Sequence, residues 1–446
     1  MDLFDEEILK SKKKKETTVK PSTIILTAII LLVILCVVIV MIIVYLKGTI
    51  LTITLDGKLA KELENIFIFE ENDNIYMPIK RMAEYLGYGA YNGDYITKSE
   101  DETKCYIETE GELVSFTLNS NILMRVVDGQ LEQIKIMEPI KEINGELCIT
   151  AEGAQDAFNF KFYHIDNEII IQTLEYLYTG YYSNALLEGY LEIEDESFAN
   201  KTAILDGMLI VKSENNKYGV ITIEGEKILE TKYDSIQYYR ETTEFLVTSN
   251  NKKGIMTVDK KTKIELSYDK IEIVKNKNDI FYVVGKSNLY GILDEEGKTI
   301  IYPEYSQIGI DVSRYEENGV TNGYILCDQI IPVMKNNQWA LFDITGSRIT
   351  EFIYESLGCH TNKVTGTVAY GVIVVPDYEL IVVEQEGKYN LITLEGKGLF
   401  NEAILDSVYI TISSGKNIYY ITSGNTTKEL ITFLQENGIT KPILSE

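Results

Sequence analysis

A short hairpin-like sequence recurs through the second half of this chain of 446 residues. The stretch KYGVITIEGEKILETKYDSI begins at Lys217, and related stretches begin at Lys252 and Leu289. Aligning the copies on Gly219 gives further anchors at Gly254, Gly291, Ala340, Asn390 and, with the weakest match, Ile418. A period of roughly 40 residues is typical of arrays in which no unit can bury its apolar face alone. The recurrence therefore predicts a stack of similar units.

A second glycine stands six residues after five of the anchors, at Gly225, Gly297, Gly346, Gly396 and Gly424. Lys260 replaces it in the second copy. Glycine takes positive φ without steric cost, so this position is predicted to close a β-hairpin. Tyrosines predicted to face inward between units stand fourteen residues after four anchors, at Tyr233, Tyr268, Tyr305 and Tyr354.

Each period has room for four short strands. In the second unit these are predicted at Ser235–Tyr239, Glu244–Thr248, Lys253–Val258 and Thr262–Leu266. Four strands per unit suit a propeller blade. Closing six or seven such blades into a ring would remove exposed sheet edges, so we favour a propeller-like antiparallel β body. An open β-solenoid is the alternative that satisfies the same pattern.

An aromatic residue precedes the anchor in four copies, at Tyr218, Tyr290, Trp339 and Tyr389. This pairing resembles the WG repeat, a bacterial β-repeat named for its Trp-Gly pair, and the resemblance covers residues 201–425. The chain then reads TTKELITFLQENG. A capping box of Thr426 and Glu429, with Gly438 past the end, predicts a C-terminal helix and tail over 426–446.

Residues 23–46 form an apolar run of 24 residues without a charge. A helix of this length is long enough to cross a bilayer, and the run is too long for the core of a signal peptide. Six lysines precede the run and only Lys47 follows it closely. The positive-inside rule therefore predicts a single-pass cell-membrane protein, with residues 1–22 in the cytoplasm and the C-terminal domains outside.

Residues 49–174 contain a faint internal duplication, with YMPIKRMAEYLGY from Tyr76 and CITAEGAQDAFNF from Cys148. Each copy reads as a strand followed by a short amphipathic helix. The first copy resembles the copper amine oxidase N-terminal-like stalk domain of bacterial surface proteins, whose proline and glycine match Pro78 and Gly87. In the second copy, Thr150 replaces the proline and Asn159 the glycine. The resemblance implies an α+β stalk, followed by a Tyr-rich linker at 175–200, and no oxidase chemistry.

No catalytic, cofactor-binding or metal-binding constellation is found, and we expect a protein that is not an enzyme. The two histidines, His164 and His360, are assigned structural roles. No C-x-x-C motif, nucleophile elbow or phosphate-binding loop is present. If the distal region is extracellular, cysteines that could pair or remain as buried thiols are Cys105, Cys148, Cys327 and Cys359.

The formal net charge of −26 argues against a nucleic-acid partner, because phosphate backbones are bound by lysine and arginine. We expect a membrane-anchored extracytoplasmic binding protein that presents its β-repeat surface to a protein or a cell-envelope polymer. A charged partner would be cationic. Two insertions, Gly309–Lys335 and Gly358–Glu386, are the expected contact loops. The alternatives are an envelope sensor acting through a partner of the cytoplasmic tail and an envelope hydrolase using paired carboxylates.

Overall fold

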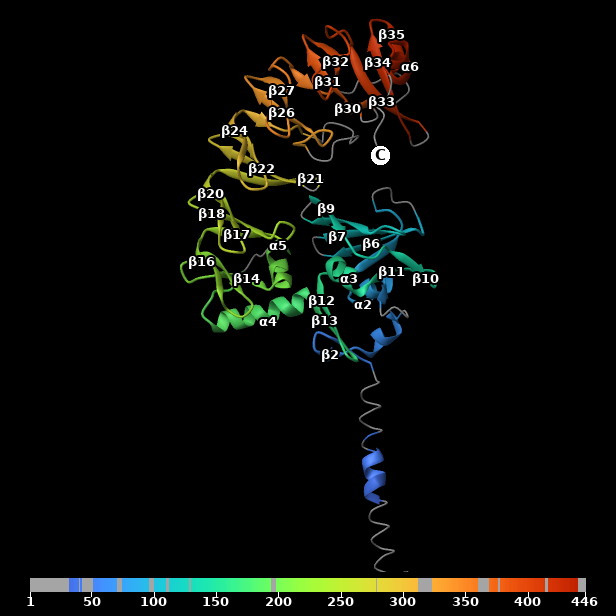
Figure 1. Ribbon diagram of the computed structural model, residues 1–446, viewed down its shortest axis with the longest axis vertical. Coiled ribbons are helices and arrows are strands. Elements are labelled where there is room, and N and C mark those ends of the chain that lie inside the picture. The colour runs from blue at the N-terminus through green and yellow to red at the C-terminus, as the bar shows by residue number, and fades with distance from the viewer. Residues whose placement is uncertain are drawn as a thin grey trace, which may run out of the picture. The chain divides into compact units, whose positions relative to one another are not determined.

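The computed structural model describes residues 32–39, 41, 51–69, 74–95, 100–109, 112–127, 130–193, 198–277, 279–311, 323–359, 369–375, 378–413 and 416–439. The chain divides into two compact units, Met1–Gly180 and Tyr181–Glu446. Both are built mainly from antiparallel β-sheets (Figure 1), which confirms the predicted β class.

The apolar run at 23–46 lies mostly outside the described residues, as does the whole of the predicted tail at 1–22. Within the run, residues 32–39 and 41 are helical and exposed. In the part of the chain that the structure describes, no helix combines the length and the apolar character that a membrane crossing requires.

The described residues of the first unit form three sheets. The first sheet has the order β12 (Phe160–Ile165), β13 (Glu168–Thr173), β1 (Thr52–Leu55), β2 (Lys58–Leu59). The second has the order β10 (Lys141–Ile143), β11 (Glu146–Thr150), β4 (Ile75–Pro78), β3 (Ile68–Phe69). The third has the order β5 (Gly89–Asn92), β6 (Lys104–Thr109), β7 (Glu112–Thr117), β8 (Ile122–Val127), β9 (Gln130–Lys135).

The internal duplication of the first unit is visible in its strand register. β4 leads into the helix α2 (Ile79–Tyr85), and β11 leads into the helix α3 (Ala151–Phe158). The two strands pair antiparallel with Met77 opposite Ile149, and these are equivalent residues of the two copies. The copies therefore meet as a pseudo-twofold pair across a shared sheet.

Equivalent residues begin and end the two helices. Pro78 and Thr150 occupy the N-cap positions, and the Thr150 hydroxyl accepts a hydrogen bond of 3.2 Å from a backbone N–H of α3. After the helices, Gly87 and Asn159 take φ of 82° and 52°. Asparagine is among the few residues other than glycine that tolerate this left-handed conformation. The degenerate second copy thus keeps the backbone geometry of the first.

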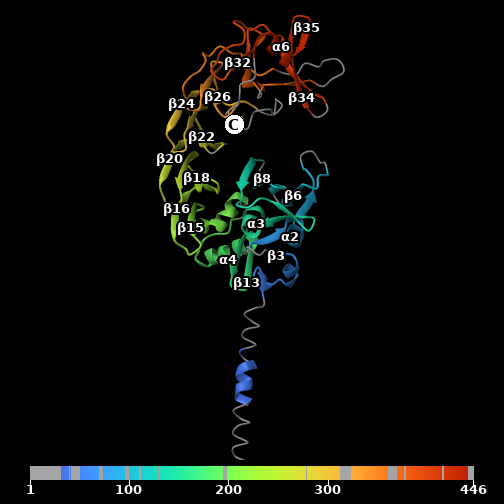
Figure 2. The same ribbon diagram turned by 45° about the vertical axis from the view of Figure 1, so that its right-hand side comes forward.

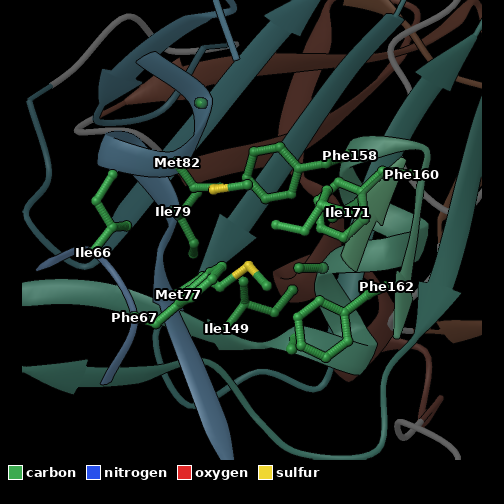
Figure 3. Close-up of a cluster of buried hydrophobic side chains, with 14 of the residues drawn as sticks. Ile66, Phe67, Met77, Ile79, Met82, Ile149, Phe158, Phe160, Phe162 and Ile171 are labelled. Carbon is green, nitrogen blue, oxygen red and sulfur yellow. The ribbon is translucent and has the colours of Figure 1, made fainter. Parts of the chain in front are cut away.

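Side chains from both copies fill one core in the first unit (Figure 3). Met77 and Ile149 are fully buried at its centre. Aromatic rings surround them, and the Phe158 and Phe160 rings stack at 6.0 Å. Neither strand–helix copy encloses this core alone, because its residues come from α2, α3, the strands that precede them and strands of the other two sheets.

The described residues of the second unit form six sheets in chain order (Figure 1, Figure 2). Sheet one contains β14 (Met208–Lys212), β15 (Tyr218–Thr222), β16 (Lys227–Tyr233). Sheet two contains β17 (Ser235–Tyr239), β18 (Glu244–Ser249), β19 (Lys252–Thr257), β20 (Thr262–Tyr268). Sheet three contains β21 (Lys270–Asn276), β22 (Asp279–Lys286), β23 (Leu289–Leu293), β24 (Thr299–Tyr305).

The later sheets are less regular. Sheet four contains β25 (Gln307–Ile308), β26 (Ile330–Lys335), β27 (Gln338–Asp343). Sheet five contains β28 (Ser356–Leu357), β30 (Val374–Val375), β31 (Leu380–Gln385), β32 (Lys388–Thr393). Sheet six contains β29 (Ala369–Gly371), β33 (Ser407–Ser413), β34 (Lys416–Ser423), β35 (Thr426–Glu429), and the helix α6 (Leu430–Glu436) follows it.

Consecutive sheets pack face to face, because neighbouring residues of one strand point to opposite sides. In β18, Phe245 and Val247 pack against sheet one, while Leu246 packs against sheet three. In β22, Tyr282 packs toward sheet two and Phe281 toward sheet four. Each inner sheet is thus buried on both faces, which is why the middle strands are nearly continuous apolar runs.

The four strands predicted for the second repeat are confirmed by β17 to β20. The turn prediction is confirmed as well, because Gly225, Gly297, Gly346, Gly396 and Gly424 all have φ between 59° and 90°. Lys260 takes the same conformation, with φ of 68°. In five of the six turns the residue at this position donates its N–H to a carbonyl three residues earlier, as Gly225 does to Thr222 at 2.9 Å.

Three expectations need correction. The residues of the proposed capping box, Thr426 and Glu429, lie in β35, where pairing with β34 competes successfully with helix formation. The anchor assigned to Ile418 is wrong, because Gly424 N–H bonds to Asp406 as Asn250 N–H bonds to Asp234. β34 therefore corresponds to the second strand of a repeat, and Gly424 to the turn between its second and third strands. The predicted linker at 175–200 contains the 14-residue helix α4 (Leu174–Leu187), as well as the start of α5 (Phe198–Lys201).

The stack is continuous from sheet one to sheet six, and each apolar cluster between sheets joins two neighbours in chain order. Among the described residues, no cluster and no strand pairing joins sheet one to sheet six. Packing between neighbours in chain order is common to the propeller-like body and to the open solenoid that the sequence offered as its alternative.

Candidate functional site

The strand order gives the stack two different edges. In an antiparallel unit of four strands, the connections 1–2 and 3–4 lie at one end and the connection 2–3 at the other. We call the first the turn edge; it includes residues 240–243, 258–261, 277 and 294–298 of sheets two and three. We call the second the hairpin edge, and residues 250–251 and 287–288 belong to it.

The hairpin edge is built from tight two-residue turns. Asn250 and Asn251 have φ of 51° and 60°, and Asn336 and Asn337 have φ of 53° and 60°. Positive φ at both central residues defines the type I′ turn, which matches the twist of the flanking strands. Asparagine favours this conformation, so the pair Asn-Asn was a turn signal that the repeat alignment left unused.

Aspartates join successive hairpins along this edge. Asp269 accepts a hydrogen bond from the Lys252 ammonium and one of 2.8 Å from the Ser287 N–H. Asp234 and Asp406 make the same pair of contacts, with Lys217 and Asn250 and with Lys388 and Gly424. The lysine hydrogen bond, followed by the backbone N–H, lowers the pKa of each aspartate. All of these contacts are structural, because they join one hairpin to the next along the edge.

The turn edge contains a pocket of about 330 Å³ between sheets two and three. Its lining comes from turns and strand ends of both sheets: Glu241, Thr242, Glu244, Lys263, Lys275, Ile280, Tyr282 and Glu295. Five of these eight side chains carry a charge, so the pocket is polar, unlike the apolar clusters deeper between the sheets.

Glu244 forms the floor of the pocket and is only 2% exposed. The Lys263 ammonium lies 2.5 Å from one carboxylate oxygen, and the Tyr282 hydroxyl donates to the other at 2.6 Å. Burial, the hydrogen bond to Glu244 and its negative charge all raise the pKa of Tyr282. The tyrosine therefore stays neutral and keeps donating, and both oxygens of the buried carboxylate are satisfied.

The rim of the pocket is less completely paired. Glu241 forms an ion pair with Lys275 across the two sheets. Thr242 also lines the pocket, and its hydroxyl oxygen is buried without a hydrogen-bond partner among the described residues. Glu295 is exposed at the turn after β23.

The predicted insertions Gly309–Lys335 and Gly358–Glu386 are only partly loops, because they include β26 and β29 to β31. Their remaining residues follow strand 1 and precede strand 2 of sheets four and five, which places their described ends at the turn edge. The first insertion returns beside sheet three, where Asp328 pairs with Lys277 at 3.1 Å. Its backbone carbonyl also accepts a hydrogen bond of 3.0 Å from Asn276. Residues 312–322 and 360–368, the middle parts of the insertions, lie outside the described residues.

The residues considered for chemistry from the sequence do not form a site. His164 is exposed on β12, and His360 lies outside the described residues. All five cysteines are free, so the Cys105–Cys148 pairing that the sequence left open is not formed. Burial raises the pKa of the Cys105 thiol to about 12 and that of Cys148 to about 11. In the described part of the chain, no group of His, Cys, Asp and Glu is arranged to hold a metal ion.

Sequence reasoning missed the pocket, because its halves are contributed by different repeat units. One signal was present, since Glu244 directly precedes the apolar run Phe245–Val247 at a position that alternation places inside. A charged residue at such a position needs a partner. Its partners, Lys263 and Tyr282, could not be identified without the packing of sheet two on sheet three.

Comparisons with known proteins give only distant likenesses. No protein-family model matches the chain. No curated protein matches it either. Among solved structures, Hsv2 of Kluyvelomyces marxianus is 15% identical with a TM-score of 0.17, over 44% of this chain and 63% of that one. The chain thus spans less than two thirds of that protein.

Two further structures cover more of the chain. A eukaryotic initiation factor is 12% identical with a TM-score of 0.25, over 76% of this chain and 87% of the other. PorZ of Porphyromonas gingivalis, a bacterial surface component of the type-IX secretion system, is 9% identical with a TM-score of 0.18, over 76% of this chain and 38% of PorZ. Scores at this level do not establish a shared fold.

Proposed function

We propose that this chain is a non-enzymatic binding scaffold that presents the turn edge of a β-repeat stack to a protein or a cell-envelope polymer. The observation that carries the proposal is that the polar pocket and the described ends of both insertions lie at this edge. The opposite edge is closed by tight turns and aspartate bridges. Loops held by a rigid repeat body are the usual place for recognition.

The pocket chemistry supports binding over catalysis. A carboxylate that acts as a base or nucleophile needs an oxygen free to reach its substrate. Both oxygens of Glu244 are held by Lys263 and Tyr282, and the carboxylate is buried beneath them. The pair therefore fixes the pocket floor.

The resemblances to WG repeats and to stalk domains fit this function. With the apolar run at 23–46 as a membrane anchor, the first unit would act as a spacer and the stack as the exposed binding body. In this proposal residues 1–22 lie in the cytoplasm. Protease added to intact cells should digest the stack and spare the tail; a fully protected stack on an accessible cell surface would contradict the topology.

The binding proposal is tested with the purified full chain in detergent micelles and with envelope fractions. Two variants are needed. In the first variant, residues 312–322 and 360–368 are replaced by Gly-Ser linkers of equal length. In the matched control, the hairpin-edge residues Asn250, Asn251, Asn336 and Asn337 are replaced by Asp-Gly pairs, which keep the type I′ turn. Retention that falls in the first variant alone supports the turn edge. Equal retention by both variants, or turnover of a glycan or peptide, contradicts the proposal.

A further inference from the structure

The pocket between sheets two and three has an unbalanced set of charges. Its lining includes three carboxylates, from Glu241, Glu244 and Glu295, and two ammonium groups, from Lys263 and Lys275. Tyr282 adds no charge because its hydroxyl stays protonated, as described above. The lining therefore carries one negative charge in excess, which adding one monovalent cation would neutralise.

The excess charge lies at the rim. Glu244 is satisfied by Lys263 and Tyr282, and Glu241 is joined to Lys275. Glu295 is the carboxylate that the lysines of the pocket leave unmatched. Its turn joins β23 to β24 of sheet three, so the pairing of these strands holds the backbone at Glu295.

The uncharged residues of the lining indicate which other groups the ligand should carry. The Thr242 hydroxyl is buried without a partner among the described residues and offers lone pairs to a donor. Ile280 adds an apolar surface to the same lining. A group with several N–H donors and an aliphatic stem matches these features, and a compact ammonium has three donors.

Resting on the proposed binding function, we propose that this pocket binds the side-chain ammonium of a lysine carried by a partner protein. The ammonium lies between Glu295 and the Thr242 hydroxyl, and the lysine stem lies against Ile280. The volume of about 330 Å³ accommodates such a side chain. The acidity of the whole chain, with a net charge of −26, favours the approach of a cationic partner.

The test uses Nα-acetyl-lysine N-methylamide as probe and the full chain in detergent micelles, followed by ligand-observed NMR. A single side chain of this size binds with a dissociation constant of about 1 mM. Glu295→Gln should weaken binding about tenfold, because a hydrogen bond to a charged group is lost. The matched control is Glu296→Gln, which removes the neighbouring carboxylate outside the lining and should change binding less than about twofold.

Thr242→Val removes the hydroxyl while keeping the side-chain shape, and should weaken the probe about threefold or more. The Nε-acetylated probe, which has no charge, should not bind. Equal binding to the Glu295 and Glu296 variants, or equal binding of the acetylated probe, overturns the proposal. A glucosamine oligomer that binds more tightly than the lysine probe would replace the protein partner with an amino-sugar polymer. Thermal melting of each variant shows whether folding is preserved.

The two proposals fail separately. Envelope retention that depends on the insertions but not on Glu295 would leave the scaffold function in place and remove the lysine pocket. Probe binding that depends on Glu295, in a chain that is retained by no envelope fraction, would do the reverse.

Discussion

The early and late sheets of the stack differ in the regularity of the strand that follows the anchor strand. In sheets one to three, the strand that follows the anchor strand is regular: β16, β20 and β24 each extend over seven residues. It is the fourth strand of the repeat, although sheet one contains only three strands. In sheets four and five, the corresponding segments do not form a regular strand. They keep isolated bridges, such as Trp339 to Tyr354 and Tyr389 to Leu405, and single backbone hydrogen bonds. The change coincides with the loss of the anchor glycine, replaced by Ala340 and Asn390.

The reason is steric. A Cβ at Gly219, Gly254 or Gly291 would lie 2.7, 2.6 or 2.4 Å from a backbone oxygen of the fourth strand. In all three sheets the register shifts at the glycine, so the fourth strand bulges over it. Only a residue without a side chain permits this approach.

Where the glycine is lost, side chains replace strand pairing. In sheet four, the Thr350 hydroxyl accepts a hydrogen bond of 2.9 Å from Leu341 N–H. In sheet five, the Asn390 amide donates to the Phe400 carbonyl at 3.0 Å and accepts from Leu391 N–H at 2.9 Å. The anchor glycine therefore keeps the fourth strand in the sheet, whereas the aromatic residue before it is present in both regions.

The largest effect is expected for Gly291→Val, because its side chain would collide with the Ile301 carbonyl oxygen. Overpacking of this kind costs about 3 kcal/mol of unfolding free energy. Denaturant titration of the full chain measures the cost, and hydrogen exchange of residues 299–305 should accelerate most. The reciprocal change, Ala340→Gly, should cost no more than about 1 kcal/mol, because no regular strand lies over Ala340. Similar costs for the two changes would refute the steric account.

A smaller loss is expected for Asn390→Ala. The residue is buried, and its removal leaves the Phe400 carbonyl and the Leu391 N–H without their partners. Unsatisfied buried groups of this type cost about 2 kcal/mol. Denaturant titration again provides the measurement, and Asn417→Ala on the exposed part of β34 is the control. Stability equal to that of the control would show that Asn390 does not hold the segment.

The turn glycines are expected to matter next. Gly225→Val should cost more than about 1 kcal/mol, because a β-branched residue is poor at φ of 90°. Gly297→Val should cost more than Gly225→Val, since its Cβ also meets the Lys263 carbonyl of the preceding sheet at 2.7 Å.

The second copy allows the opposite experiment. Lys260→Gly should stabilise the fold by about 0.5 to 1 kcal/mol, because φ of 68° is unfavourable for lysine. Thermal melting at fixed pH provides the measurement. Destabilisation by this change would show that the lysine makes a contact that outweighs the backbone strain.

The smallest effect concerns the aspartates of the hairpin edge. Their folded-state pKa values are lowered, so the stability they add is present above an unfolded pKa of about 4 and disappears as pH falls through the folded pKa. The triple change of Asp234, Asp269 and Asp406 to Asn should therefore lower the melting temperature at neutral pH but leave it unchanged at the acid end. These groups are exposed, so added salt should reduce the difference. A pH-independent difference would exclude the ionic contribution.

The local features of the fold could be predicted from the sequence, and the contacts between units could not. Gly225 and Gly297 predicted turns, because the preference for glycine at these positions depends only on its positive φ. Gly424 also closes a hairpin, but positive φ at a glycine does not show which two strands of the repeat that hairpin joins. Glu241 and Lys275 belong to different units, and only the packing of sheet two on sheet three brings them together in one pocket. The role of Gly291 likewise depends on a carbonyl ten residues later.

The burial of inner sheets on both faces has a consequence for synthesis. A ribosome delivers the chain from its N-terminus, so each sheet emerges with one covered face and one bare apolar face. Leu246 of β18, for example, stays exposed until sheet three is complete. Every partly synthesised stack therefore exposes an apolar sheet face that is covered only by the next segment to be translated. Growth ends only when α6 places Leu430 and Leu434 in the last cluster, so a chain truncated within the stack would expose a whole sheet face to aggregation.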